Sequence, residues 1–345
     1  MLIKSLLISK KKIHTKIPVW FMRQAGRYLP EYKEIRNKQE NFIKLCLSPN
    51  LAAEISLQPI YRFNFDGIIL FSDILIIPYA LGQNVRFEEK IGPILSPLEK
   101  YADLPKTLER DWKIKLSPIL KTINILKRKK KENKTLIGFC GSPFTVLTYM
   151  IEGGTSKNHL KIKKFLIEKP KEANLLIKKL IKISIIYLNG QIKAGADVIQ
   201  LFESWSGLLE GDLYTKYIIE PNKKIVEEIK KRNKNVPVIC FPRKSNWKTL
   251  EFIKKVPCDC LSMDLETDDR TIEYCKKKGI TVQGNLDPVR LLLGGRQLKK
   301  EVKKIIEKFR KQKFIFNLSH GILPDTPIKN VEKTIKYIKE YENSN

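Results

Sequence analysis

The chain has 345 residues, which suits one large α/β barrel or two ordinary domains. Hydrophobic residues make up 42% and aromatic residues 9%, so a sizeable core can form and global disorder is excluded. The net charge of +29 is compatible with binding to nucleic acid, to a membrane surface or to an anionic substrate. The lysines are spread along the chain, however, and crowd only at 127–131 without interleaved aromatics, which favours a solvated surface for most of the charge.

The cysteines and the N-terminus indicate a cytoplasmic protein. None of the six cysteines forms a CxxC pair, and Cys258 and Cys260 are closer than the usual spacing of zinc ligands. They are interpreted as reduced, packed thiols. The N-terminal stretch MLIKSLLISKKK has too short an apolar run and no small-residue cleavage site for a signal peptide. The longest apolar region, 67–82, is interrupted by polar residues and proline, so no transmembrane helix is expected.

Strand-like apolar runs recur along the chain, with helical patterns between them. Most are continuous rather than alternating, as expected for parallel strands covered on both faces. Eight such units predict an α/β protein with one distorted (β/α)8 barrel domain over residues 1–345. A doubly wound open sheet is the alternative. The runs are 19–22, 67–71, 135–139, 197–202, 236–241, 260–263, 280–283 and 314–318.

Three of the intervening stretches carry clear helix signals. Ser48-Pro49 provides an N-cap and a first-turn proline for a helix that follows. Apolar residues spaced i, i+4, i+7 and i+11 over 176–187 predict an amphipathic helix that ends near Gly190. Thr326-Pro327 opens a final helix with one apolar face.

The residues that follow each run are the candidates for chemistry, because (β/α)8 barrels place their active sites at the C-terminal ends of the strands. Arg23 and Arg27 follow the first run, Asp73 the second and His320 the last. Nearly every run is followed by polar or glycine-rich residues, which eight unrelated loops would seldom all show. The other such stretches are 141–145 with Tyr149 beyond it, 203–207, 242–244, Asp264 and 284–288.

The basic and acidic candidates also have structural interpretations. The two arginines, four residues apart around a glycine, could form surface salt bridges, although their planar forks also suit carboxylates or phosphates. Asp73 lies within an apolar stretch, so its carboxylate must be paired or functional. A salt bridge from Asp73 to Arg23 or Arg27 is compatible with both a structural and a functional role, since the three side chains could form one site.

The remaining candidates are weaker by themselves. Tyr149 could be a core tyrosine, and His320 could be structural, since no HxH, HxxxH or His-x-Cys pattern accompanies it. Ser204 lacks a GxSxG elbow, which favours a hydroxyl donor over a nucleophile. No phosphate-binding glycine motif is present.

Taken together, the motifs resemble those of the uroporphyrinogen decarboxylase family of haem biosynthesis. They occur in the family's order and span nearly the whole chain, and the first and last are the most specific. They are VWFMRQAGRYLPEY (19–32), SPNLAAEISLQP (48–59), ILFSDIL (69–75), GSPFTVLTYMIEGG (141–154), QLFESWSG (200–207), QGNLDP (283–288) and FNLSHGILPDTP (316–327).

The resemblance implies a (β/α)8 barrel that forms a homodimer and uses no metal or organic cofactor. It implies decarboxylation of the four acetates of uroporphyrinogen III to methyl groups, giving coproporphyrinogen III and four CO2. Catalytic roles are implied for Asp73, Arg23 and Tyr149, and substrate contacts for Arg23, Gln24, Ala25, Gly26, Arg27, Asp73, Tyr149, Ser204 and His320. Serine in GSPFT and Leu265 in MDLETDD depart from the family pattern beside the pocket.

Three other functions are weighed against this one. Corrinoid-linked methyltransferases share the barrel but hold zinc through a His-x-Cys on the fifth strand, where this chain has Val238-Ile239-Cys240. A basic nucleic-acid binder would bind through the +29 charge, and its affinity would not depend on Asp73. A catalytically dead barrel is disfavoured because every assigned polar group is present. No nucleic-acid or membrane partner is expected.

Overall fold

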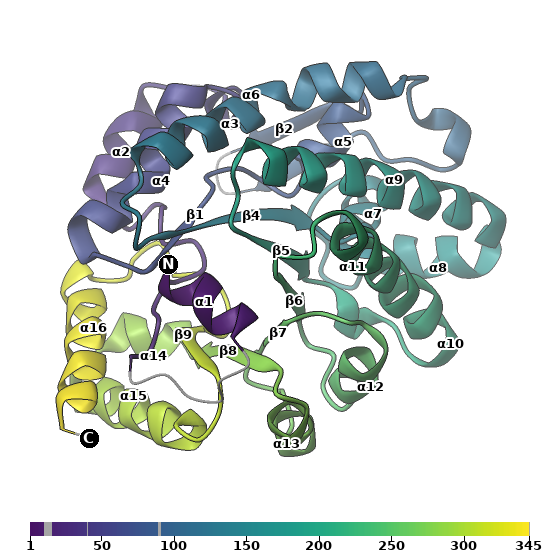
Figure 1. Ribbon diagram of the computed structural model, residues 1–345. Helices are drawn as coiled ribbons and strands as arrows, with labels where there is room; N and C mark the ends of the chain where they lie inside the picture. The colour runs from purple at the N-terminus through teal and green to yellow at the C-terminus, as the bar shows by residue number, and fades with distance from the viewer. Residues whose placement is uncertain (10–15, 40, 89–90, 345) are drawn as a thin grey trace.

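The computed structural model describes residues 1–9, 16–39, 41–88 and 91–344. A curled sheet of parallel strands forms its centre, and helices surround the sheet (Figure 1). The seven strands follow one another in chain order without a switch point, so the topology is that of the predicted barrel and not of a doubly wound sheet. They are β1 (Gly67–Ile69), β4 (Thr135–Gly141), β5 (Val198–Glu203), β6 (Val238–Pro242), β7 (Cys260–Ser262), β8 (Thr281–Leu286) and β9 (Phe314–Leu318).

The first predicted strand, 19–22, is not a regular strand. It lies between β9 and the start of β1 and pairs with each through a few main-chain bonds. On one side Trp20 N donates to Phe316 O at 3.3 Å, and on the other Asp66 N donates to Val19 O at 2.8 Å. The segment therefore fills the eighth place in the ring while making only a single bridge.

The pairing of this segment stops at Met22 for two reasons. Met22 N donates to the side chain of Asn317 at 3.0 Å instead of to a strand carbonyl. The next residue, Arg23, turns the chain with a φ of 60°. The other seven predicted runs are strands with small shifts at their ends.

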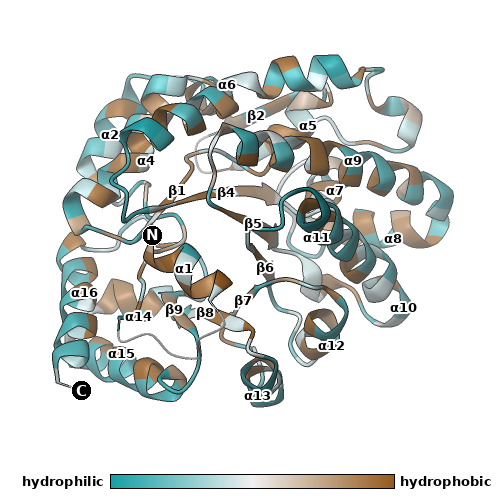
Figure 2. Ribbon diagram, viewed as in Figure 1, coloured by the Kyte–Doolittle hydropathy of each residue, from teal (hydrophilic) through white to brown (hydrophobic). Residues whose placement is uncertain are grey.

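The helices cover the outside of the sheet, and Figure 2 shows their hydrophilic faces turned outward over brown strands. A hairpin of β2 (Val85–Glu88) and β3 (Gly92–Leu95), which no run predicts, follows β1. The helices are α1 (Leu2–Ile8), α2 (Pro30–Asn37), α3 (Phe42–Cys46), α4 (Pro49–Phe63), α5 (Ile76–Ala80), α6 (Glu109–Lys129), α7 (Pro143–Glu152), α8 (Leu160–Glu168), α9 (Pro170–Ala194), α10 (Gly211–Tyr214), α11 (Glu220–Arg232), α12 (Lys248–Lys255), α13 (Asp269–Lys278), α14 (Pro288–Leu293), α15 (Gly295–Phe309) and α16 (Ile328–Asn343), with short turns η1 (Tyr101–Asp103), η2 (Ser206–Leu208) and the π-helical η3 (Thr215–Ile219).

Two of the helix predictions are confirmed and one needs a correction. Helix α4 begins at Pro49 after Ser48, and α16 begins directly after Pro327. Helix α9 does not end near Gly190 but runs on to Ala194. Gly190 lies inside α9, where α9 packs closely on α6. A Cβ at this position would lie 3.0 Å from the Leu120 side chain on α6. The glycine thus serves helix packing, and Gly195 ends the helix.

Helix α1 closes one end of the ring. Its side chains Ile3, Leu6 and Leu7 are buried in a cluster with residues from the inner face of the sheet, such as Ile239. Lys4 N also donates to the hydroxyl of Thr135, the first residue of β4, at 3.3 Å. Figure 1 shows α1 lying across the ring. Because α1 covers the N-terminal ends of the strands, the mouth for a substrate lies at the opposite, C-terminal ends.

All six cysteines are buried and unbridged, as the sequence predicts. Among the described residues, no helix is both long and apolar enough to span a membrane.

Candidate active site at the C-terminal mouth of the barrel

Asp73 is held in a turn directly after β1. Its Oδ1 accepts a hydrogen bond from Leu75 N at 2.8 Å, so the side chain caps the turn that leads into α5. The residue is half-buried, and burial raises the pKa of its carboxyl group. The positive charge of Arg23 acts in the opposite direction and favours the carboxylate. Asp73 thus presents a fixed carboxylate beside one cation.

Arg23 reaches the same mouth from the segment that closes the ring. Its φ of 60° lies in the left-handed region, which costs an L-residue of this size about 1 kcal/mol or more. The side chain is exposed and its stem rests on Gly321, in the loop after β9. An unfavourable main-chain conformation that is retained at an exposed cation is typical of functional sites.

Tyr149 lies on α7 and interacts electrostatically with Asp73. Burial raises the pKa of its phenol, and the negative charge of Asp73 raises it further, whereas the Trp205 side chain, Arg23 and Arg243 lower it. The ring packs against that of Trp205, with centroids 6.1 Å apart. Tyr149 therefore remains a neutral phenol that can donate a hydrogen bond into the mouth.

Glu203, the last residue of β5, holds the first turn of α7. Its carboxylate accepts from Thr145 N at 2.8 Å and from the Thr145 hydroxyl, and from the side-chain amide of Asn222 at 3.1 Å. Burial raises the pKa of Glu203 to about 7, against these hydrogen bonds, which lower it. Because α7 carries Tyr149, this buried carboxyl group fixes one wall of the mouth.

His320 follows β9 and lies among positive charges. Burial lowers the pKa of its imidazole to about 3, and Arg243, Arg23 and Lys244 contribute in the same direction. In the free protein His320 is therefore neutral at physiological pH. It can donate or accept one hydrogen bond per ring nitrogen but carries no charge.

Arg23 thus interacts electrostatically with each of Asp73, Tyr149 and His320, so these four residues share one end of the barrel. It places the other sequence candidates differently. Arg27 is exposed, and its charge acts on Tyr32.

Ser204 is half-buried directly after β5, and its hydroxyl makes no hydrogen bond within the described part of the chain. Ala25 and Gly26 are half-buried in the turn beside Arg23.

The side chain of Gln24 is turned away from the mouth. It is fully buried, donates to Gly67 O at 2.9 Å and accepts from Phe21 N at 3.1 Å. Its carbonyl accepts from the Tyr28 hydroxyl at 2.8 Å. Gln24 therefore fastens the arginine-bearing turn to β1, and in this conformation its side chain cannot reach a substrate.

Arg243 lies in one of the candidate stretches after the runs, 242–244, but sequence reasoning assigned it no role at this mouth. It follows β6, is half-buried, and interacts electrostatically with Arg23 and Tyr149. Its place directly after the fifth apolar run was a usable signal, but the family motifs do not include it. The neighbouring Asp264 is structural, since it accepts from the main chain of Lys244 and Glu266. Leu265, expected at a pocket wall, is 59% exposed.

The comparison with known families agrees with this geometry. The model of the family described as uroporphyrinogen decarboxylase (URO-D) matches residues 5–341. The chain belongs to the uroporphyrinogen decarboxylase family. A uroporphyrinogen decarboxylase of Rickettsia felis is 42% identical over 342 residues, covering 99% of this chain and 98% of the relative. The uroporphyrinogen decarboxylase of Rickettsia canadensis is 42% identical over 339 residues, covering 98% of this chain and 99% of the relative.

Solved structures show the same fold at low identity. A methyltransferase from Methanosarcina mazei superposes with a TM-score of 0.78 at 17% identity, covering 98% of this chain and 97% of its own. A B12-independent methionine synthase from Shewanella sp. W3-18-1 gives 0.57 at 12% identity, covering 87% and 88%. These two likenesses concern the barrel alone. In the described ranges, no three His, Cys, Asp or Glu side chains are grouped as metal ligands.

Proposed function

We propose that this protein removes the four acetate carboxyl groups of uroporphyrinogen III as CO2 and leaves methyl groups, giving coproporphyrinogen III. The observation that carries the proposal is a single carboxylate, Asp73, set beside the cation Arg23 at the mouth of a barrel of this family. The substrate bears eight carboxylates around its rim and four pyrrole N–H groups at its centre. A mouth with cations around one central acceptor matches that distribution of charge.

Asp73 is assigned the central role in catalysis. One carboxylate can accept hydrogen bonds from several pyrrole N–H groups. Protonation of the ring carbon next to the acetate makes the pyrrole cationic, and the carboxylate of Asp73 stabilises this cation as it forms. The bond between the acetate methylene and its carboxylate then breaks, its electron pair neutralises the ring, and CO2 leaves. A proton added at the methylene and the loss of the ring proton give the methyl group.

The substrate ring accepts the electron pair in this scheme, which is why we propose a reaction without a cofactor. Arg23 is assigned as the anchor of the reacting acetate, and it can relay a proton to the ring. Its high intrinsic pKa makes it a weak acid, so anchoring is its main role. Tyr149, as a neutral phenol, donates a hydrogen bond to the same acetate.

The outer residues are assigned to the remaining carboxylates. Arg27, Ser204 and His320 provide one cation and two neutral hydrogen-bonding groups for acetates or propionates. Ala25 and Gly26 shape the turn that presents Arg23. We further propose that residues 1–345 form one domain and that the chain works as a homodimer in the cytoplasm, where its buried thiols stay reduced.

The function is tested by anaerobic incubation with enzymatically generated uroporphyrinogen III and separation of the products by carboxylate number. Hepta-, hexa- and pentacarboxylate intermediates and a tetracarboxylate product are expected. If uroporphyrinogen is recovered unchanged from the folded wild-type protein, the assignment is wrong. Sedimentation analysis of the same preparation tests the dimer.

A further inference from the structure

We propose that Arg243 binds a propionate carboxylate of the tetrapyrrole on the side of the mouth opposite Arg23. This inference rests on the proposed function and assigns a substrate contact that no sequence motif indicated. Three features of Arg243 support it: its position in the ring, the hydrogen bonds that hold its main chain, and a guanidinium group without a bonded partner among the described residues.

Arg243 and Arg23 come from opposite sides of the ring. Arg23 follows the segment that lies between β9 and β1. From there the order runs through β1, β4 and β5 to β6, so the strand before Arg243 is halfway round the eight places. The two guanidinium groups nevertheless affect each other and both lower the pKa of His320. They therefore extend toward the same space from facing walls.

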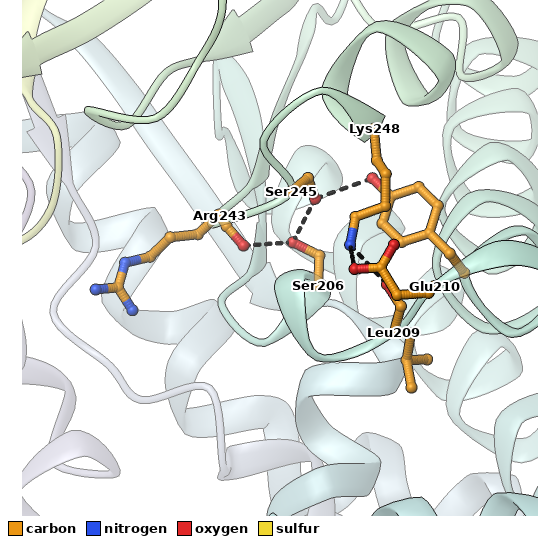
Figure 3. A network of polar contacts seen from close by, with 7 residues as sticks. Ser206, Leu209, Glu210, Arg243, Ser245 and Lys248 are labelled. Carbon is orange, nitrogen blue, oxygen red and sulfur yellow. Dashed lines mark hydrogen bonds and ion pairs between the residues drawn. The ribbon is translucent and has the colours of Figure 1, made fainter. Parts of the chain in front are cut away.

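The main chain of Arg243 is held by a buried hydroxyl network (Figure 3). Its carbonyl accepts from the Ser206 hydroxyl at 2.6 Å. The Ser245 hydroxyl donates to Ser206 Oγ at 2.9 Å, and the Tyr214 hydroxyl donates to Ser245 Oγ at 2.9 Å. On the other side Arg243 N donates to the carbonyl of Glu203 at 3.1 Å. The main chain of Arg243 is thus fixed on both sides, as is expected of a residue whose side chain positions a ligand.

The other cation of this network, Lys248, is fully satisfied. Its ammonium group is buried and donates to Leu209 O at 2.8 Å and to the carboxylate of Glu210 at 2.5 Å. It also lies over the ring of Tyr214, 5.2 Å from the centroid. Lys248 is therefore a structural cation that holds the loop.

Arg243 differs because its guanidinium has no such partner. Figure 3 shows the side chain pointing away from the network. It is half-buried, and within the described residues its guanidinium makes no hydrogen bond or ion pair. Two carboxylates, Asp264 and Glu266, attract it without a hydrogen bond or ion pair, and that of Asp264 is already engaged by Lys244 N at 2.5 Å and by the Thr267 hydroxyl at 3.1 Å. Burial lowers the pKa of Arg243, so an anion that pairs with it recovers the lost solvation.

The substrate's chemistry selects the propionate. The four acetates must be processed one after another beside Asp73, so the pyrrole on the far side changes from step to step. An acetate on that pyrrole is present in some cycles and already a methyl group in others. Only the propionates remain through all four decarboxylations. A cation that serves every cycle from the wall opposite Arg23 must therefore bind a propionate.

The product coproporphyrinogen III carries only propionates and undergoes no further reaction in this scheme, so it is the probe. Binding is measured by anaerobic equilibrium dialysis, with the porphyrinogen oxidised afterwards to fluorescent coproporphyrin. Loss of one charge-assisted contact in Arg243→Gln is expected to raise Kd by about 10- to 100-fold. Arg243→Lys should fall between Arg243→Gln and the wild type because it keeps the charge but not the fork.

The control is Arg232→Gln, since Arg232 is an exposed arginine at the end of α11 whose one ion pair among the described residues is with Glu228. Its Kd should equal that of the wild type. The melting temperature of Arg243→Gln should also be unchanged, because its guanidinium makes no hydrogen bond or ion pair with the residues that the structure describes. A Kd for Arg243→Gln within two-fold of the wild type would overturn the inference. Since no turnover is needed, this result is independent of whether the wild type decarboxylates uroporphyrinogen.

Discussion

Gly321 lies directly against the stem of Arg23. A Cβ at Gly321 would be 2.4 Å from Cδ and 2.7 Å from Cγ of that arginine. The loop after β9 thus supports the cation that follows the first segment, and the main chains of the two are joined by a bond from Ile322 N to Met22 O at 2.9 Å. The absence of a side chain at position 321 determines where the guanidinium lies.

Gly321→Ala should therefore displace Arg23 without unfolding the protein, because the atoms it meets belong to a flexible side chain. We expect the KM for uroporphyrinogen to rise by about ten-fold, the loss of one charge-assisted contact, with a melting temperature close to that of the wild type. A double-mutant cycle with Arg23→Ala checks the cause. If Gly321→Ala is equally harmful when Arg23 is already absent, the contact is not the reason.

The left-handed conformation of Arg23 should be measurable as strain. Arg23→Gly is expected to be more stable than Arg23→Ala by about 1 kcal/mol, because glycine tolerates a positive φ. Both variants should bind substrate poorly. At Arg27, whose φ is not positive, the same pair should show the opposite order, with alanine the more stable. Denaturant unfolding of the four variants tests this.

Asp73→Asn should reduce kcat by about 100-fold or more, because a neutral amide cannot stabilise the cationic pyrrole. The fold should be retained, since the amide oxygen can still accept from Leu75 N. Asp73→Ala loses that acceptor and should also be less stable. Wild-type turnover by Asp73→Asn would contradict the assigned role of the carboxylate.

His320 should not titrate near neutral pH in the free protein. Its pKa of about 3 is below the ordinary 6.5, so the folded state binds fewer protons than the unfolded state between these values. Stability that His320 contributes above pH 6.5 is therefore lost as the pH falls towards 3. NMR titration of the chain's three histidines checks the pKa, and a His320 resonance that titrates near 6.5 contradicts it. The kcat/KM profile of His320→Asn should keep the wild-type shape.

Glu203 should have the opposite effect on stability. Its pKa of about 7 lies above the ordinary 4.5, so the folded state binds more protons between these values. The free energy of unfolding should then fall as the pH rises through this window, by about 3 kcal/mol at most from this group. Glu203→Gln should remove that part of the slope. Unfolding curves at pH 5 and pH 8 for the two proteins give the comparison, and equal slopes contradict it.

The sequence by itself determined the parts of this protein that depend on local pattern. Continuous apolar runs predicted seven of the strands, because strands covered on both faces need apolar residues throughout. The position of Arg23, Asp73 and His320 after such runs predicted that they would lie at one edge of the sheet, since parallel strands end at one edge. Tyr149 received a role in the site only from the family resemblance. The start of α4 at Pro49 could also be predicted, because proline is favoured in the first turn of a helix.

Tertiary structure alone decided what depends on contacts between distant residues. The run 19–22 is apolar like the others, yet the side chain of Asn317 takes its main-chain donor and ends the pairing. Gln24 belongs to a family motif but is buried against β1, which no local pattern reveals. Arg243 and Lys248 look alike in the sequence as cations after β6. Only the fold gives Lys248 a carboxylate and leaves the guanidinium of Arg243 without an ion pair in the described part of the chain, because partner choice depends on which loops meet in space.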